Sequence, residues 1–318
     1  MKSLTPLLIL LMTSFSPHLL AGWKVTSGPD RLVGGEHQSC MLPVWSPDGN
    51  KIAFTGPGYA GIWVLEVQNG QIKQISNETA VGFGFAWSGS GAAIVSRVTR
   101  YEGARRFNAV KVFNVNTGQA WPLTEYQLGL RGLPNWTEND RRIYIFDGQK
   151  LNVFDSGIET PDLQKTATGK PLHYIENGQI AVKQTGSDKA STFDPLGGRR
   201  YINLVASPDG GKLAFEVVGG DMYVMNVDGT GLIDLGTGNR PQWSPDGQYL
   251  VYQITEDNGH DFTRSDIYTI SIAGTDKAQL TNTNARLEMN ASWSPDGNRI
   301  VFDTFEEGAI YIVNVEKE

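Results

Sequence analysis

The chain has 318 residues, a formal net charge of −7 and one cysteine, Cys40. A net negative charge argues against non-specific binding to nucleic acid or to an anionic membrane surface. A single cysteine excludes an intramolecular disulfide framework, and Cys40 precedes an apolar run, so we expect it to be a small buried residue. We therefore expect neither nucleic acid nor an anionic membrane surface to be a partner.

The first 21 residues have the pattern of a secretory signal peptide. Lys2 supplies the basic start, residues 7–12 form a short apolar core, and Ala21 is a small residue at a suitable cleavage point. Prolines interrupt this stretch, and it is too short to span a membrane well. We therefore expect a signal peptide over 1–21, a single domain over 22–318, and a periplasmic or secreted protein without membrane insertion.

One short phrase recurs along the rest of the chain. Trp-Ser-Pro-Asp-Gly occupies residues 45–49, 243–247 and 293–297, and altered copies occupy 87–91 and 206–210. Proline presets the backbone for a tight turn, and glycine supplies the positive φ that closes it. Apolar residues follow each copy, so each turn is expected to join the innermost strand of a repeat to the next strand. The tryptophan is expected to pack between neighbouring repeats.

The spacing of these copies predicts a β-propeller of four-stranded antiparallel blades. Two degenerate copies, at Trp136 and Tyr174, fill the gap in the middle of the chain. The anchor residues then fall at positions 45, 87, 136, 174, 206, 243 and 293, which makes seven blades. If the segment at Tyr174 is an insertion, the ring has six blades.

The N-terminal segment is expected to close the ring. Leu123 precedes Trp136 by 13 residues at the end of an outer strand, and Leu32 precedes Trp45 by the same 13 residues. The last repeat ends without an outer strand of its own. A strand around Leu32 would therefore complete the last blade, which removes the exposed sheet edges of an open repeat array.

The repeated phrases, the Leu-Thr endings of outer strands such as 122–124 and 279–281, and the secretory start together resemble the propeller of the TolB family. The resemblance implies a periplasmic protein that binds envelope partners, in particular the peptidoglycan-associated lipoprotein Pal. The TolB ring has six blades and follows an α/β domain, whereas the repeats here predict seven blades and no such domain. Propellers of peptidases and of oligogalacturonate lyases carry the same phrase.

The sequence places the expected binding surface on the face opposite the repeated turns, where two long loops, 97–108 and 255–265, would lie. Basic residues gather in the second blade and the loop that follows it: Arg97, Arg100, Arg105, Arg106 and Arg131. Acidic residues gather in the loops of the sixth and seventh blades, against Arg264 and Arg286: Glu256, Asp257, Asp261, Glu288, Glu306 and Glu307. His260 lies in the same long loop of the sixth blade. These groups predict a rim with opposite charges on its two sides, which would orient a partner; the alternative is a set of unrelated solvated charges.

Eight further polar residues are expected near the axis of the ring: His37, Gln38, His173, Arg200, Tyr201, Asn203, Arg240 and Asn290. They could bind a sugar or a carboxylate, or they could only brace the blades. No nucleophile turn, zinc-protease motif or phosphate-binding loop is present. We therefore expect a monomeric protein-binding scaffold without catalytic residues, cofactor or metal. The alternative is a binding or lyase-type propeller for an anionic oligosaccharide, in which His37 and His173 could hold a metal.

Overall fold

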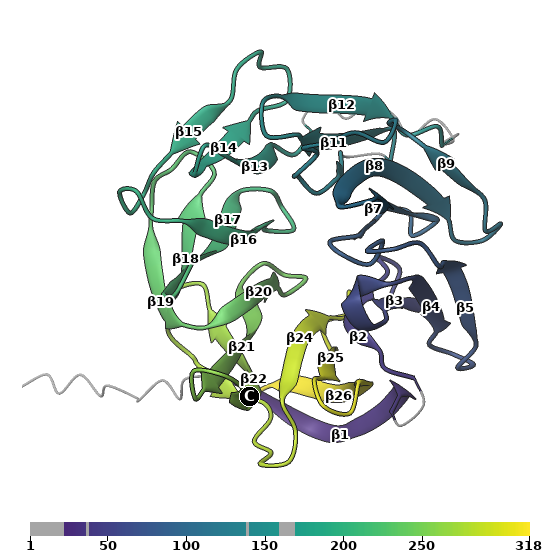
Figure 1. Ribbon diagram of the computed structural model, residues 1–318. Helices are drawn as coiled ribbons and strands as arrows, with labels where there is room; N and C mark the ends of the chain where they lie inside the picture. Colours follow the sequence, from purple (N-terminus) through teal and green to yellow (C-terminus); the bar gives the residue numbers. More distant parts are fainter. Residues whose placement is uncertain (1–21, 36–37, 138–139, 159–168) are drawn as a thin grey trace, which may run out of the picture.

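The computed structural model describes residues 22–35, 38–137, 140–158 and 169–318. Within these ranges the strands form seven antiparallel sheets, which follow one another around a ring (Figure 1). The expected all-β propeller is therefore confirmed. Tyr174 lies in the first strand of the fourth sheet, so it marks a blade and the ring has seven blades. The expected signal peptide over 1–21 lies outside the described residues.

The first two blades each have four strands in sequence order from the axis outward. Blade 1 contains β2 (Met41–Trp45), β3 (Lys51–Thr55), β4 (Ile62–Glu66) and β5 (Ile72–Ser76), with a 3-10 turn, η1 (Pro57–Tyr59), after β3. Blade 2 contains β6 (Ala86–Trp87), β7 (Ala93–Glu102), β8 (Arg105–Asn114) and β9 (Ala120–Pro122).

The next two blades each show three strands in the described part of the chain. Blade 3 contains β10 (Asn135–Trp136), β11 (Arg142–Phe146) and β12 (Leu151–Asp155). Blade 4 contains β13 (Leu172–Glu176), β14 (Gln179–Lys183) and β15 (Ser191–Phe193). They differ in this respect from the other five sheets, which have the four strands that the repeat pattern predicts.

Four-stranded sheets complete the ring. Blade 5 contains β16 (Tyr201–Ala206), β17 (Lys212–Val217), β18 (Asp221–Asn226) and β19 (Ile233–Thr237). Blade 6 contains β20 (Asn239–Trp243), β21 (Tyr249–Asp257), β22 (Phe262–Ser271) and β23 (Ala278–Gln279). Blade 7 contains β24 (Glu288–Trp293), β25 (Arg299–Thr304), β26 (Ala309–Lys317) and, as its outermost strand, β1 (Trp23–Gly34).

The N-terminal strand closes the ring as expected. β1 pairs with β26 from Trp23 opposite Lys317 to Gly34 opposite Ala309, so the two ends of the chain share one sheet (Figure 1). The Trp23 ring also lies against Trp293, with 4.8 Å between ring centroids. Because the last blade borrows its outer strand from the start of the chain, the ring cannot open without breaking this pairing.

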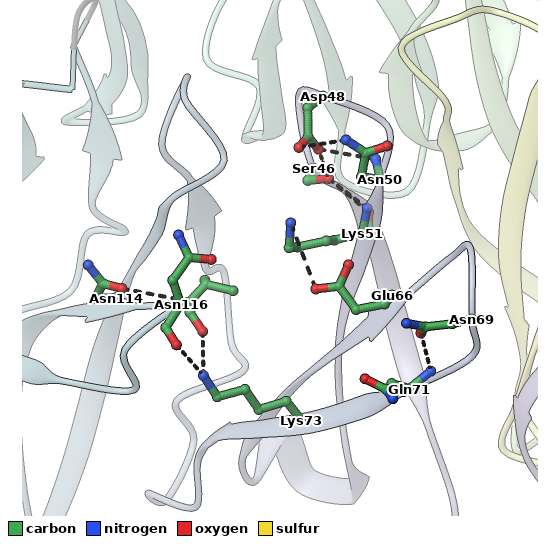
Figure 2. A network of polar contacts seen from close by, with 11 residues as sticks. Ser46, Asp48, Asn50, Lys51, Glu66, Asn69, Gln71, Lys73, Asn114 and Asn116 are labelled. Atoms are coloured by element: carbon green, nitrogen blue, oxygen red, sulfur yellow. Dashed lines mark hydrogen bonds and ion pairs between the residues drawn. The ribbon is translucent and has the colours of Figure 1, made fainter. Parts of the chain in front are cut away.

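The repeated turns have the predicted geometry. In blade 1, Gly49 has a φ of 70°, and the Ser46 hydroxyl donates to Asp48 over 2.5 Å. The Lys51 backbone N–H donates back to the Ser46 oxygen, so the turn is closed from both sides (Figure 2). Partial burial raises the pKa of Asp48, but hydrogen bonds from Ser46 and Asn50 outweigh it and hold that pKa below its usual value. These contacts give Asp48 a structural role in closing the turn.

The anchor tryptophans link neighbouring blades, as the sequence predicts. The indole N–H of Trp87 donates to the carbonyl oxygen of Val44 over 3.1 Å, and Trp136 and Trp243 make the same bond to the preceding blade. In each case the acceptor directly precedes the anchor residue of that blade. Trp45 packs among buried apolar residues of blades 7 and 1. The core therefore lies between successive sheets, where each tryptophan covers its neighbour.

Candidate functional site

Two faces of the ring follow from the antiparallel blades. The Trp-Ser-Pro-Asp-Gly turns lie at one end of the strands, on what we call the turn face. Connections between the second and third strands of each blade, and connections from one blade to the next, lie at the other end. We call this second surface the hairpin face; it is the face that the sequence selects as the expected binding surface.

The two long loops expected on the hairpin face are paired strands instead. In blade 2 the pairing of β7 with β8 continues without interruption from Ala93 opposite Asn114 to Glu102 opposite Arg105. Gly103, with a φ of 59°, helps to form the tight turn that joins them. In blade 6 the pairing of β21 with β22 reaches Asp257 opposite Phe262. Both segments therefore present side chains from fixed positions, alternating between the two sides of a hairpin.

Arg97 differs from the other arginines of blade 2 because it is buried, with an exposed fraction of 6%. Its guanidinium donates to the carbonyl oxygens of Arg131 and Gly132, in the connection that leads into blade 3. Burial, together with the charge of Arg106, lowers the pKa of Arg97 to about 10. The side chain therefore braces the start of blade 3 and is not presented to solvent.

Arg100 is exposed and held in place by its neighbours. Its guanidinium lies 4.5 Å from the centre of the Tyr126 ring and forms an ion pair with Glu102 at 2.8 Å. Tyr126 in turn donates its hydroxyl hydrogen to Glu78, which is paired with Lys111 at 2.9 Å. Arg100 thus has a fixed position on the hairpin, and its charge is partly balanced there.

The remaining basic residues of this region are exposed. Arg106 donates to Asn108 and Thr99 across the hairpin, over 3.3 and 3.2 Å. Arg105 lies at the turn, opposite Glu102. The Arg131 side chain is also exposed, beside the carbonyl groups that Arg97 binds. The structure therefore brings the five arginines of the sequence hypothesis to one region, with four of them at its surface.

The residues expected near the axis come from different blades. His173, in β13, has its Nδ1 atom buried and without a hydrogen-bond partner among the described residues, and burial lowers its pKa. Tyr201 is buried and donates to Asp194 over 2.6 Å, within the connection from blade 4 to blade 5. Arg200 is exposed beside it. His37 lies outside the described residues.

Arg240 belongs to an arrangement that recurs around the ring. It has a φ of 54°, in a bulge of β20, and its backbone N–H donates to the buried carboxylate of Glu216 in blade 5. Asn290 has a φ of 53° and donates its N–H to Gln253 of blade 6 over 2.7 Å. A side chain of a second strand thus clamps the bulged inner strand of the next blade.

The sequence analysis missed these clamp residues, although a signal for them is present. Glu216, Gln253 and Asp303 each lie ten residues after an anchor, at positions 206, 243 and 293. Arg97 lies ten residues after Trp87 and also links two blades. It differs from the other three in being the donor, because its guanidinium donates to carbonyl groups of the connection into blade 3. These four residues join blades, Asp303 through the backbone N–H of Leu42, whereas Thr55, ten residues after Trp45, bonds within blade 1. Because these side chains are buried, they stabilise the ring and are not part of the exposed binding surface.

Glu288 and Arg286 lie at the start of blade 7. Glu288 is fully buried, accepts hydrogen bonds from Thr283 and Thr281, and has a pKa raised chiefly by burial. Arg286 pairs with Glu307 at 3.3 Å and stacks on the Tyr311 ring at 4.5 Å. His260 is exposed at the tip of the blade 6 hairpin. Blades 2 and 6 lie on opposite sides of the ring (Figure 1), so the basic and acidic groups are well separated.

Large apolar side chains that remain exposed are concentrated on the hairpin face. Those in its hairpins and blade connections are Phe83, Tyr101, Leu128, Leu133, Val218, Phe262 and Phe305. Only a few others are exposed elsewhere in the described residues: Ile72, Val153 and Leu232. A gathering of apolar side chains beside charged groups is typical of a protein interaction surface.

The described ranges hold neither a metal-ligand cluster nor a membrane-spanning helix. No group of three or more His, Cys, Asp or Glu side chains is placed to hold a metal ion there. No helix in this part of the chain is long and apolar enough to cross a membrane. Cys40 is buried, as expected, and burial raises the pKa of its thiol to about 12.

No protein-family model matches the chain. Among solved structures, TolB from Acinetobacter baumannii is similar with a TM-score of 0.54 and 16% identity, over 81% of this chain and 57% of that one. A putative TolB from Agrobacterium tumefaciens has a TM-score of 0.54 and 16% identity, covering 89% of this chain and 91% of that one. The β-propeller domain of Myceliophteria thermophila Cps50 (Swd1) has a TM-score of 0.56 and 10% identity, covering 91% and 100%.

These similarities show a shared fold. The chain is a TolB-like β-propeller in architecture, which confirms the resemblance predicted from the repeated turns. It spans 57% of the length of the Acinetobacter protein, so that protein's role as a whole does not pass to this chain with the fold.

Proposed function

We propose, from the propeller fold shared with TolB, that this chain is a binding scaffold of the cell envelope that attaches to a partner protein through its hairpin face. One observation carries the proposal: the exposed apolar side chains gather on that face, beside charged residues held in fixed positions. Such surfaces bind proteins because apolar contacts provide affinity and charges orient the encounter. The proposal assigns no catalytic step to the chain.

The expected signal peptide places the proposed scaffold in the periplasm, or outside the cell after secretion. An envelope protein of the Pal kind is the partner that the TolB resemblance suggests. We propose that the mature chain binds it as a monomer, because ring closure already completes the fold within one chain. The alternative of an oligosaccharide-binding propeller depends on His173, Arg200, Arg240 and His37. The first three come from different parts of the ring: blade 4, the connection from blade 4 to blade 5, and blade 6. His37 lies outside the described residues.

Affinity capture from envelope extract would test the proposal. The baits are the native chain, a charge variant with Arg100, Arg105 and Arg106 changed to Glu, and an apolar variant, Tyr101→Ser. Matched controls on the turn face are Arg142→Glu and Leu232→Ser, both at exposed positions. Circular dichroism and thermal unfolding verify that every bait is folded.

The proposal predicts a protein that the native bait and both control baits enrich and that at least one hairpin-face variant loses. Loss with the charge variant should be accompanied by weaker binding of the native bait at higher salt, since screening reduces electrostatic steering. Equal enrichment by all baits, or loss only with the turn-face variants, would refute an interface on the hairpin face. Failure of every bait to enrich a protein would refute the scaffold function.

A further inference from the structure

Two aromatic side chains from different blades meet in solvent on the hairpin face. Phe262 begins β22 at the tip of the blade 6 hairpin, and Phe305 lies between β25 and β26 in blade 7. Their ring centroids are 6.1 Å apart at an interplanar angle of 84°, and their exposed fractions are 46% and 63%. Contact between the rings holds them in place without covering them. An exposed aromatic pair of this kind is a ready anchor for a partner.

Acidic side chains surround this pair. The exposed acids of the same two connections are Glu256, Asp257, Asp261, Glu306 and Glu307, of which Glu307 is paired with Arg286. None of the other four forms an ion pair with a lysine or arginine in the part of the chain that the structure describes. Asp257 and Glu306 accept hydrogen bonds only from backbone N–H groups, those of Gly259 and Leu287. The negative charge of these four acids is therefore balanced only in part, through the position of Arg264 opposite Glu256.

Arg264 and Arg286 balance the exposed acids only in part, because each is paired most closely with another acid; Arg264 also lies opposite Glu256 in the hairpin. Arg264 binds the buried carboxylate of Asp266 at 2.7 Å. Arg286 binds Glu307 at 3.3 Å and is stacked on Tyr311. On the opposite side of the ring the balance differs, because Arg100 has both an acid and an aromatic ring as partners. The patch on blades 6 and 7 therefore carries an excess of negative charge.

We infer that Phe262, Phe305 and the four acids bind a cationic segment of the partner protein, with lysine or arginine side chains lying against the rings. A cation over an aromatic ring is attracted by the π electrons, and the aliphatic part of the side chain covers apolar surface. The four carboxylates pair with the ammonium or guanidinium groups at the ends of these side chains. This inference rests on the proposed function and specifies the chemistry of the partner and the blades that it contacts.

Photo-crosslinking in intact cells that express the full chain separates this inference from the general proposal. The photoreactive residue p-benzoylphenylalanine replaces Phe305, Tyr101 or Leu232 in three separate variants. Position 305 reports on the aromatic pair, position 101 on the blade 2 hairpin and position 232 on the turn face. Mass spectrometry then identifies the peptide attached to each position.

A peptide rich in lysine or arginine, attached at position 305 and not at 232, is the expected result. Crosslinking at position 101 alone would retain the scaffold function and refute the inference. An acidic or uncharged peptide at position 305 would also refute it. Crosslinks confined to position 232, or none at any position, would overturn both.

A defined probe supplies a second readout. The probe is a fluorescent peptide of alternating arginine and glycine, with a peptide of alternating glutamate and glycine as its matched control, and binding is followed by anisotropy. We expect the basic peptide to bind at least tenfold more tightly than the acidic one. Phe262→Ser with Phe305→Ser should weaken that binding about tenfold, as the loss of a desolvated cation–π contact implies. Equal binding of both peptides, or an unchanged affinity in the double variant, would refute the inference.

Discussion

The carboxylate of Asp303 accepts a hydrogen bond from the backbone N–H of Leu42, with 2.6 Å between the oxygen and the nitrogen. Asp303 lies in blade 7 and Leu42 in blade 1, so this bond joins the last blade to the first. Asn290 donates to the same carboxylate over 2.9 Å. A buried acid at this junction is thus fully engaged in holding the first and last blades together.

The first prediction concerns the effect of pH on this junction. Burial raises the pKa of Asp303 from 3.8 to about 7. Because the folded pKa is higher than the unfolded one, the stabilising contribution of this carboxyl is complete below pH 3.8 and is lost as the pH rises to about 7. Asp303→Asn keeps an acceptor for Leu42 and removes the titration.

We expect the free energy of unfolding of the native chain to fall relative to that of Asp303→Asn over this interval, by up to about 1.4 kcal/mol per pH unit. Urea unfolding of both proteins from pH 4 to pH 8 measures the difference. The thiol of Cys40 does not titrate in this range, because its pKa is about 12. Parallel stability curves would show that Asp303 does not change its protonation on folding.

The second prediction concerns the tryptophans between blades. Trp87→Phe keeps an aromatic ring and removes the N–H that binds the Val44 carbonyl. We expect a loss of about 1 kcal/mol in the free energy of unfolding, the usual value of a hydrogen bond in a protein. Trp45→Phe is the control, because the indole N–H of Trp45 is buried without a hydrogen-bond partner among the described residues.

The Trp45 variant should lose less stability than the Trp87 variant, and it could gain some, since it removes an unsatisfied buried donor. Urea unfolding at one pH compares the two. Equal losses would mean that ring size alone, and not the link between blades, explains the effect of these substitutions.

The third prediction concerns Arg97. Arg97→Met removes the donors that hold the carbonyl groups of Arg131 and Gly132, so we expect a loss of about 1–3 kcal/mol in stability. Hydrogen exchange should also become faster in residues 129–134. Arg105→Met is the matched control, because that side chain is exposed and its loss should change stability by no more than about 0.5 kcal/mol. Similar effects of the two substitutions would contradict the bracing role of Arg97.

The fourth prediction concerns the start of the mature chain. Cleavage after Ala21 leaves Gly22 as the first residue and keeps the closing strand, in which Trp23 pairs with Lys317. N-terminal sequencing of protein recovered from the periplasm should therefore begin at Gly22. Retention of Met1 would contradict the signal peptide. A start beyond Gly34 would remove β1 and contradict its role in closing the ring.

The architecture could be predicted from the sequence because its signals are local. A proline, an aspartate and a glycine in consecutive positions form a tight turn whatever surrounds them. Repetition of that turn therefore marks the blades one by one, and even the weak copy at Tyr174 marks a real sheet. Ring closure also followed from spacing, since Leu32 keeps the distance to Trp45 that Leu123 keeps to Trp136.

The candidate site depended on contacts that no local pattern contains. Arg97 and Arg100 are three residues apart in one hairpin, yet one is buried as a brace and the other is exposed, because successive side chains point to opposite sides of a strand. Phe262 and Phe305 meet only because the ring places two blades side by side. By itself the sequence determined the order of the blades, through short-range turn chemistry, and left six or seven as their number until the structure showed a sheet at Tyr174. Tertiary structure decided which charges are free, because pairing and burial arise between blades that are distant in the chain.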